Sequence, residues 1–538
     1  MKLLGIQSFP LLVTFLAVLA APAPGIGADE RAQHPLTLDE ALSRALSRNY
    51  VIAIERDSYA TAAHTVRREE GAYDFELGWG AAFEKRTDPV NSLLSGAPAG
   101  AVAPELKSLD FDASLSRLLP SGGSVSLLAT GARAATDNSF SLLSPSYGTS
   151  LGVEVRQPLL RNRAIDPVRR RIRVARSERT RFFASLKRTI ADTLAAVDTA
   201  YWGLTAAQRE IEVRTAAVAL AEQQLGETRA RIGAGSLPAN EEAQPRAELE
   251  RRKGELLGTQ EQAVRAENAL KALILDEGGD PLWSLRFVPS DPVETDAAPI
   301  DVAAALVTAE VTRPEIEEAK AGLVSRSIEL RAARDETKPR LDAYASYARR
   351  GLAGDLNPQA APIFGLPLVV PGDLNGGAGR SLGTLADGLY PDVRVGLSLT
   401  VTIGNRAAKA NVAISEAEER RAAAGLARVR QGVRVEVLNA VAAVEATAER
   451  IGAARAAREA AEIQFRSEQE RFTVGMSTNF LVLTRQNDLS RARLDEIQAL
   501  LDHRRALTER ERASGRLLEE RHVVVEAAPV PGASGGPK

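Results

Sequence analysis

Apolar and polar residues alternate strictly in several stretches of the chain. From Tyr73 to Phe83 every odd position is apolar or aromatic, and the even positions are charged or small. A two-residue period gives a β-strand one apolar face and one polar face. The alternation recurs in 109–115, 125–127, 147–155 and 393–401, and more weakly in 341–347. Alternation alone fits a half-buried sheet of a soluble domain as well as the wall of a membrane barrel.

Two features favour the membrane barrel. Several of the strands are about ten residues long with aromatic residues near their ends, which is typical of barrel strands and their interfacial girdles. A soluble sheet would also need a second apolar layer, whereas the neighbouring sequence is polar amphipathic helix, beginning with a predicted helix over 36–69.

The other periodic segments predict very long helices. No proline lies between Pro167 and Pro238, and apolar residues recur at seven-residue intervals, which is the coiled-coil signature. About 65 helical residues would span roughly 100 Å at 1.5 Å per residue. The first series is Val197, Leu204, Ile211, Val218, Leu225 and Ile232; the second is Val437, Val444, Ile451, Phe465 and Phe472, interrupted by Arg458. We expect each long helix to reverse at a glycine, Gly235 or Gly475, into return helices over 239–275 and 478–517.

The strand-into-helix unit occurs twice, about 240 residues apart, and internal repeats indicate repeated structural units. The segments 38–42, 152–163 and 231–235 correspond, in the same order, to 300–306, 396–406 and 471–475. We therefore predict a first repeat over 29–285 and a second over 286–526, each containing a helix, strands, a long helix and a return helix. The Pro/Gly/Ser-rich segment 527–538 is predicted to be a disordered tail.

The N-terminus predicts an export signal. Lys2 precedes an apolar core from Leu11 to Ala21, and small residues end the segment before Asp29. The alternative is a transmembrane anchor, but Pro22 and Pro24 favour a cleaved signal peptide over 1–28. No later uncharged apolar run is long enough for a membrane helix.

Composition removes several classes of function. The net charge of −2 gives no basic excess for binding nucleic acid, and the absence of cysteine excludes disulfides and thiolate metal sites. The four histidines share no metal-ligand spacing, so we expect all of them at the surface and neither metal nor cofactor. No motif of an envelope enzyme is present, and Asp110 and Asp112 fall on the polar face of a strand.

Two segments, 87–106 and 351–390, are rich in Gly, Pro and Asn and are predicted to be long loops at the outer end of the barrel. An additional alternating pair within 107–132, joined by Pro120-Ser-Gly-Gly123, predicts a hairpin. It could stand outside the membrane, or enter the wall and give six strands per protomer. We favour the hairpin outside.

An ordered set of short motifs links the two halves to a known family. The set is Leu38-Asp-Glu-Ala-Leu42, Arg48-Asn-Tyr50, Gln157-Pro-Leu-Leu-Arg161, Arg313-Pro-Glu315, Pro339-Arg-Leu341, Ile403-Gly-Asn-Arg406, Arg471-Phe-Thr-Val-Gly475 and Gln486. Over nearly all of 36–517 the chain resembles the TolC-like outer-membrane efflux protein family, the outer-membrane factor of tripartite efflux and type I secretion systems.

The resemblance implies a mainly α-helical protein with membrane β-structure in the outer membrane of a Gram-negative cell. It implies a homotrimer in which each protomer gives four strands to one shared β-barrel within outer-membrane lipid. The coiled-coil-like helices would continue that barrel as a periplasmic α-barrel. A periplasmic adaptor (membrane-fusion) protein and an inner-membrane pump or secretion ATPase would open this passive conduit, so neither catalysis nor a nucleic-acid partner is implied.

The resemblance also places a periplasmic gate and adaptor-docking tips at the helix reversals. These residues are Gly235, Ser236, Pro238, Glu241, Glu242, Phe472, Gly475, Ser477, Thr478, Leu481 and Thr484. The strand-to-helix junctions fall at Gln157, Pro158, Gly404 and Asn405. Leu481 and Thr484 occupy positions where well-known members carry ring-forming aspartates, so we expect a less acidic constriction. Glu241 and Glu242 could supply acidity instead, or could simply be solvated carboxylates favoured by the helix dipole.

A non-transporting coiled-coil scaffold of the cell envelope is the main alternative, since heptads alone would allow it. It leaves the membrane-type strands unexplained, and it does not account for the joining of each long helix to a strand. The sequence therefore favours an export channel.

Overall fold

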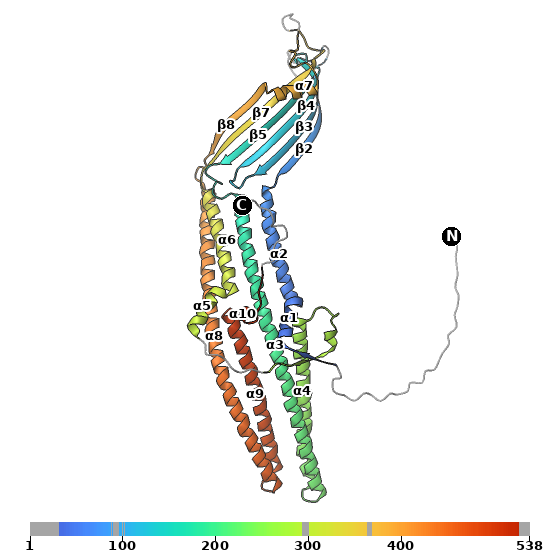
Figure 1. The fold of residues 1–538 in the computed structure, drawn as a ribbon, viewed down its shortest axis with the longest axis vertical. Helices are drawn as coiled ribbons and strands as arrows, with labels where there is room; N and C mark the ends of the chain where they lie inside the picture. Colours follow the sequence, from blue (N-terminus) through green and yellow to red (C-terminus); the bar gives the residue numbers. More distant parts are fainter. Residues whose placement is uncertain are drawn as a thin grey trace, which may run out of the picture.

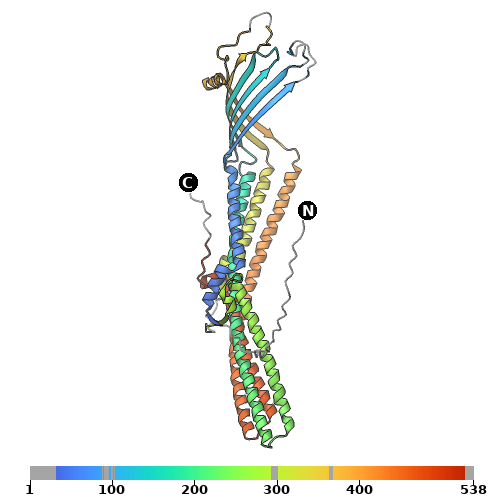
Figure 2. The same ribbon diagram turned by 90° about the vertical axis from the view of Figure 1, so that its right-hand side faces the viewer.

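The computed structural model describes residues 32–87, 89, 96–98, 101, 103–292, 301–362 and 368–526. The predicted signal peptide and disordered tail lie outside these residues, so both stay predictions. The described chain is a long rod with a β-sheet at one end and long helices extending from it (Figure 1). In Figure 2, turned by 90°, the strands fan out above the helices and run directly into them.

The sheet has six strands in the order β2-β3-β4-β5-β7-β8, with every neighbouring pair antiparallel. The strands are β2 (Glu76–Thr87), β3 (Glu105–Leu118), β4 (Ser124–Thr136), β5 (Leu143–Pro158), β7 (Arg340–Leu356) and β8 (Tyr390–Thr400). The additional hairpin is therefore β3 and β4, and its placement outside the wall is wrong. Both strands are hydrogen-bonded along both edges because their alternation matches that of β2 and β5. The four strands implied by the family resemblance are likewise replaced by six.

The register aligns the alternation of all six strands. Leu115 lies opposite both Leu77 and Leu127, so apolar positions fall on one face. The series continues through Val153, Tyr347 and Val393. On this apolar face Trp79 and Val395 are 79% and 80% exposed. The other, polar face carries Asp110 and Asp112, as the sequence predicted.

Four long helices continue from the sheet, and two more return alongside them (Figure 1). The four that adjoin the sheet are α2 (Tyr50–Glu70) and α6 (Pro314–Glu336), which lead into it, and α3 (Pro167–Gly233) and α8 (Arg406–Thr473), which leave it; the returning ones are α4 (Ala243–Ile274) and α9 (Asn479–Ala513). The prediction of two long helices with glycine reversals is confirmed. Their apolar series is buried in part, at Val197, Leu204 and Leu225 of α3 and at Val437, Val444 and Ile451 of α8.

Two element predictions need correction. The predicted helix over 36–69 is two helices, α1 (Leu38–Arg48) and α2, because the side chain of Asn49 accepts hydrogen bonds from the N–H groups of Val51 and Ile52. The predicted loop over 351–390 begins inside β7 and contains a helix, α7 (Ala378–Asp387), which packs against β5 and β7.

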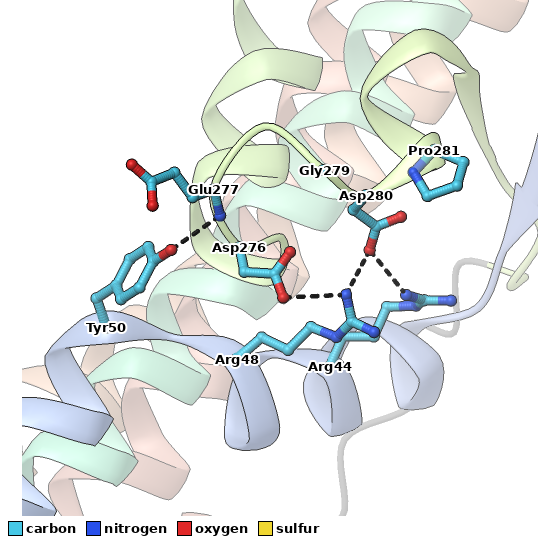
Figure 3. A pocket seen from close by; sticks show the side chains of 8 residues that line it. All are labelled: Arg44, Arg48, Tyr50, Asp276, Glu277, Gly279, Asp280 and Pro281. Carbon is cyan, nitrogen blue, oxygen red and sulfur yellow. Dashed lines mark hydrogen bonds and ion pairs between the residues drawn. The ribbon is translucent and has the colours of Figure 1, made fainter.

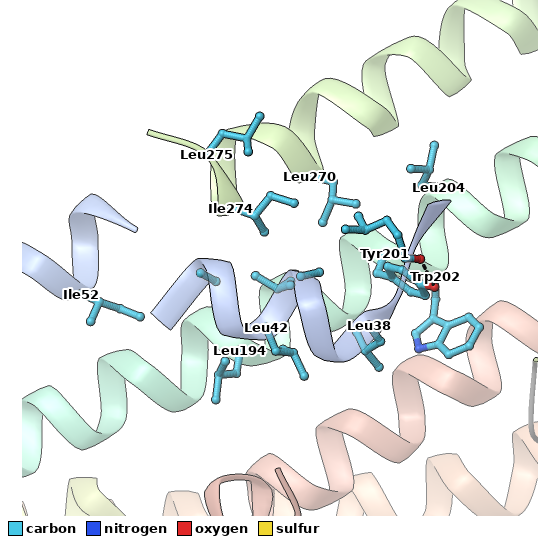
Figure 4. Packing of buried hydrophobic residues seen from close by; sticks show 14 of the residues in the cluster. Leu38, Leu42, Ile52, Leu194, Tyr201, Trp202, Leu204, Leu270, Ile274 and Leu275 are labelled. Carbon is cyan, nitrogen blue, oxygen red and sulfur yellow. Dashed lines mark hydrogen bonds between the residues drawn. The ribbon is translucent and has the colours of Figure 1, made fainter. Parts of the chain in front are cut away.

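The main hydrophobic core lies at the waist of the rod, midway along α3 (Figure 4). Leu38 and Leu42 of α1 pack there with residues of α3 and with Leu270 and Ile274 of α4. Short elements complete the waist, and β1 runs parallel to β6. They are β1 (Gln33–Leu36), β6 (Arg286–Pro289), α5 (Val302–Thr312) and α10 (Leu517–Glu520).

An ion-pair cluster fastens α1 to the segment that follows α4 (Figure 3). Arg48 contacts Asp280 at 2.6 Å and Asp276 at 3.3 Å, and Arg44 lies 3.7 Å from Asp280. The Tyr50 hydroxyl accepts a hydrogen bond from the N–H of Glu277. The cluster lines an open hollow of about 660 Å³, in which Asp276 and Asp280 pair with the arginines.

Candidate functional site

The first helix reversal is a compact turn built on one glycine. Gly235 has a φ of +72°, a left-handed conformation that favours glycine. Its N–H donates to the carbonyl of Ile232 at 2.9 Å, and the N–H of Ser236 donates to that of Arg231 at 2.9 Å. These two bonds satisfy carbonyl groups that the end of α3 would leave unpaired.

The second reversal has the same backbone. Gly475 has a φ of +81°, and its N–H donates to the carbonyl of Phe472 at 3.1 Å. The N–H of Met476 donates to the carbonyl of Arg471 at 2.8 Å. The repeat seen in the sequence therefore extends to the hydrogen bonds of the two tips.

The acidic residues of the first tip differ in their surroundings. Pro238 precedes a short 3-10 helix (Ala239–Glu242), and the N–H of Glu241 donates to its carbonyl at 3.1 Å. The carboxylate of Glu242 pairs with Arg229 of α3 at 2.8 Å. Of the two candidate acids, Glu242 is thus balanced by a cation.

The second tip begins its return helix with hydroxyl groups. The Ser477 hydroxyl donates to Glu468, and the Thr478 side chain accepts from the N–H of Leu481 at 3.4 Å. The Thr484 hydroxyl donates to the carbonyl of Phe480, at 2.8 Å. Leu481 is exposed, so positions 481 and 484 present an apolar and a neutral polar side chain.

The two tips of one protomer touch through side chains that only the structure reveals. The guanidinium of Arg231 lies 4.3 Å from the ring centre of Phe472, which is 7% exposed. Gln224 of α3 donates to the carboxamide of Asn479 at 2.6 Å. Sequence reasoning identified Phe472 but missed Gln224 and Asn479, because no motif marks polar partners on helices 255 residues apart.

A second link lies farther from the tips. Arg251 and Arg252 of α4 each donate to the carboxamide oxygen of Asn487 on α9, at 3.2 Å. Arg252 is buried and also donates to the carbonyl of Ala217 and to Glu248. Burial raises the pKa of the Glu248 carboxyl, but hydrogen bonds from the two arginines outweigh it and hold that pKa below its usual range.

The first strand-to-helix junction holds the β3–β4 turn. Gln157 donates to the carbonyl of Ser121 at 3.1 Å and accepts from the Ser121 hydroxyl at 2.7 Å. Pro158 is buried at the end of β5. The turn between β3 and β4 therefore lies at the helical end of the sheet, with no helix of its own continuing from it.

The second junction is anchored to the end of α6. Gly404 and Asn405 both have positive φ, +79° and +43°. The Asn405 carboxamide donates to the carbonyl of Thr337 at 3.0 Å. From the first junction, the N–H of Asn162 donates to Asp335 at 2.6 Å, so both junctions meet at α6.

Within the described ranges, no group of three or more histidine or acidic side chains could hold a metal ion. Over the same residues, no helix combines the length and apolar content needed to cross a membrane. The prediction that every histidine is at the surface is wrong for His503, which is fully buried with Nδ1 3.0 Å from the Thr447 hydroxyl.

An amphipathic sheet continued by long paired helices defines a channel-type architecture, and the comparisons with known proteins agree. The family model described as "Outer membrane efflux protein" matches residues 111–274 and 305–516. The chain belongs to this family. It is therefore a protein of the Gram-negative outer membrane that extends into the periplasm, in a family of efflux channels rather than enzymes.

Solved structures share the fold at low sequence identity. A membrane protein from Pseudomonas aeruginosa has a TM-score of 0.62 and 18% identity, covering 89% of this chain and 90% of that one. The Campylobacter jejuni CmeC outer membrane channel has a TM-score of 0.61 and 14% identity, and the match covers 89% of this chain and 85% of that one. The outer membrane protein VceC from Vibrio cholerae has a TM-score of 0.61 and 16% identity, and the match covers 89% of this chain and 96% of that one. The comparison with curated protein sequences finds no match.

Proposed function

We propose that this chain is the outer-membrane exit duct of a tripartite efflux pump or type I secretion system. In this proposal three identical chains form one passive conduit, and a periplasmic adaptor with an inner-membrane pump or secretion ATPase opens it at the helix reversals. The apolar face of the sheet contacts lipid, and the polar face lines the lumen. The division into repeats over 29–285 and 286–526 belongs to the same proposal.

The observation that carries the proposal is the open sheet. β2 and β8 lie at its two edges, and among the described residues no strand pairs with the outer edge of either, although each is of membrane length. Lipid offers no hydrogen-bond partners, so such edges must pair with other strands. Pairing of β2 with β8 of the next protomer closes the wall without any change in the protomer.

Six strands per protomer make this wall wide. Three copies of the six-stranded sheet give eighteen strands, and each sheet adjoins four helices of its own protomer. Barrel diameter grows roughly linearly with strand number. The barrel is therefore wider than one built from four strands per protomer. The β3–β4 turns contact the first strand-to-helix junction and lie at the periplasmic end of the barrel.

Planar-bilayer recording of the purified full chain tests the channel, together with the mass of the particle in detergent. The expected result is a trimer that conducts ions. A non-conducting rod would instead establish the coiled-coil scaffold as the function.

Covalent capture tests the closure of the wall, and the natural chain contains no cysteine to interfere. Ala82→Cys on β2 is combined in turn with Arg394→Cys, Ser398→Cys and Thr400→Cys on β8. At least one pair should give disulfide-linked trimers after oxidation. Ala82→Cys with Ala132→Cys is the matched control, because these positions lie two strands apart in one sheet, about 10 Å and beyond disulfide reach.

A further inference from the structure

Four cations stand on the apolar face of the sheet, three near its far end, remote from the helices, and one midway along β7. They are Lys85 of β2, Lys107 of β3, Arg133 of β4 and Arg349 of β7, and all four are exposed. We refer to them as the basic belt. A charged side chain on a lipid-facing strand is unfavourable near the middle of a bilayer and tolerated near its interface.

The register assigns these side chains to the apolar face without ambiguity. Lys85 lies opposite Lys107, one alternation step beyond the pair formed by Phe83 and Leu109. Arg133 lies opposite Leu109 on its other side. Arg349 lies opposite Leu151, which is an exposed residue of the same apolar face.

The register orders the four cations along the sheet. Arg133 lies one alternation step closer to the helices than the pair of Lys85 and Lys107. Arg349 lies two further steps closer, because Arg133 is opposite Tyr147, which in turn is opposite Ala353 of β7. The strands are inclined to the long axis of the rod (Figure 1), so residues of one row need not lie at one level.

Among the residues that the structure describes, the belt contains more cations than the carboxylates paired with it. Lys85 and Lys107 share a single carboxylate, Glu105, and contact it within 3.0 Å. Arg133 donates to the hydroxyl of Tyr147, at 3.4 Å, and Arg349 to that of Tyr347, at 3.0 Å. Tyrosines beside cations above an apolar band are typical of a membrane interface.

The polar face differs at the same end of the sheet. Arg350 and Arg394 both pair with Asp392, at 2.7 and 3.2 Å. Arg86, next to Lys85 but on the polar face, lies 3.6 Å from Glu84. Each of these polar-face cations thus contacts a carboxylate, whereas Arg133 and Arg349 of the belt contact tyrosine hydroxyls.

Helix α7 lies on the apolar face beside the belt. The Thr149 hydroxyl contacts the Ser381 hydroxyl at 3.0 Å, and Arg349 donates to the carbonyl of Ala386 near the end of the helix. Leu382 of α7 is 56% exposed on the surface that the lipid would meet. The helix therefore presents an apolar side chain next to a basic row, as interfacial helices do.

We infer that the basic belt binds the phosphate groups of lipid headgroups in the outer leaflet, with the acyl chains lying along the apolar band below and against α7. The belt faces away from the lumen, so the inference depends on the outer-membrane location and not on what the channel carries. The occupant is a phosphorylated glycolipid headgroup rather than free phosphate, because the cations border an apolar surface that acyl chains cover.

Native mass spectrometry of the detergent-solubilised full chain tests the inference with two probes, bis-phosphorylated lipid A and the same lipid without its phosphates. The wild type should retain the phosphorylated form about tenfold more tightly. The variant Lys85→Gln, Lys107→Gln, Arg133→Gln should lose this preference. The matched control Arg86→Gln, Arg350→Gln, Arg394→Gln removes equal charge from the other face and should keep it.

Three outcomes overturn the inference: equal retention of both lipids by the wild type, equal loss in the control variant, or displacement of the lipid by millimolar inorganic phosphate. A variant with Lys85→Arg and Lys107→Arg guards against misfolding, because it keeps the charge and should bind as the wild type does. Loss of channel conductance with lipid preference intact would count against the proposed function alone.

Discussion

The guanidinium of Arg231 lies over the ring of Phe472, 4.3 Å from its centre, and this contact joins the two helix reversals of the protomer. The two residues belong to different repeats and sit one turn before the two tip glycines. An arginine stacked on an aromatic ring contributes about 0.5–2 kcal/mol, depending on burial. The contact therefore favours the arrangement in which both tips are drawn together.

We predict that Arg231→Gln and Phe472→Leu each increase the open probability of the channel in planar bilayers about two- to thirty-fold, the ratio that 0.5–2 kcal/mol sets. Combining them should add little, since both remove one contact. Arg471→Gln is the matched control, because Arg471 has the equivalent position in the second repeat and is exposed. An equal effect of Arg471→Gln would show that charge, not the contact, controls opening.

The second prediction concerns cations at the constriction. Leu481 and Thr484 supply no charge, and Glu242 is paired with Arg229. We expect millimolar multivalent cations on the periplasmic side to block the wild type weakly. Leu481→Asp with Thr484→Asp should create strong block, since three copies would give rings of carboxylates. Leu481→Asn with Thr484→Asn is the uncharged control, and strong block of the wild type would contradict the prediction.

The sequence predicted the two-fold repeat, the long helices and the glycine reversals because each depends on local periodicity and turn chemistry. It misplaced the β3–β4 hairpin because the alternation of 109–115 and 125–129 defines strands but not their neighbours. The pairing of β3 with β2 and of β4 with β5 depends on tertiary structure, because it requires apolar positions such as Leu115 and Leu127 to fall in matching register.

At the candidate site, too, features that depend on local sequence could be predicted and features that depend on tertiary structure could not. Gly235 and Gly475 could be identified because the repeats align them, and Phe472 because the family resemblance implies an aromatic residue there. The side chains that contact the tips could not be identified. Arg231 and Gln224 lie on a helix with many similar polar residues, and only tertiary packing selects them. Arg231 contacts Phe472 of α8, and Gln224 contacts Asn479 of α9. α7 was missed because its ten residues carry three glycines or serines and a short apolar stripe, which resembles a loop.

The third prediction concerns a buried ion pair at the waist. Lys271 is fully buried, lies 2.7 Å from Glu267, and donates to the carbonyls of Trp283 and Leu285. Lys271→Met leaves a carboxylate buried without its cation, which costs about 3–5 kcal/mol. Thermal unfolding followed by circular dichroism should show a clear fall in Tm.

Two variants control that experiment. Glu267→Gln with Lys271→Met removes both charges and should recover part of the lost stability. Lys253→Met removes a partly exposed cation whose nearest carboxylates lie 3.6 and 3.8 Å away, and should change stability by less than about 1 kcal/mol. A double variant no more stable than Lys271→Met would argue that the lysine acts through its carbonyl contacts alone.

The fourth prediction is a dependence on pH at Asp198. Burial raises the pKa of this carboxyl above its usual range. The Thr508 hydroxyl and Arg521, each 2.7 Å away, and the nearby Arg504 lower that pKa but do not outweigh burial. Glu511 lies in the same cluster and contacts Arg521 at 3.8 Å. A raised folded-state pKa means that the contribution of Asp198 to stability is most favourable below about pH 4 and is lost as the pH rises through the folded pKa.

Asp198→Asn removes this dependence. The Tm of the variant relative to the wild type should therefore be higher at pH 7 than at pH 4. Asp502→Asn, on a partly exposed position of α9, serves as the control and should show a smaller difference between the two pH values. A difference of opposite sign would mean that the pairing with Arg521 outweighs burial.

The last prediction distinguishes a wall of six strands from one of four. Phe111 and Asp112 are neighbours on β3 that point to opposite faces of the sheet. In reconstituted vesicles, a fluorophore on Phe111→Cys should be quenched by brominated lipid, whereas Asp112→Cys should react with a water-soluble maleimide and escape that quenching. A hairpin outside the membrane would leave both positions in water and unquenched.

Deletion of 105–136 tests the width directly. β2 and β5 run antiparallel to each other and would become neighbours, so the expected product is a trimer with twelve strands. Because diameter scales roughly with strand number, its cross-section should be under about half that of the wild type. Polymers applied from the extracellular side should then be excluded at a smaller size. Gly131→Ala is the control, since an added Cβ meets no atom within 4 Å and the wall keeps its six strands. An unchanged size limit after deletion would mean that β3 and β4 do not contribute to the circumference of the pore.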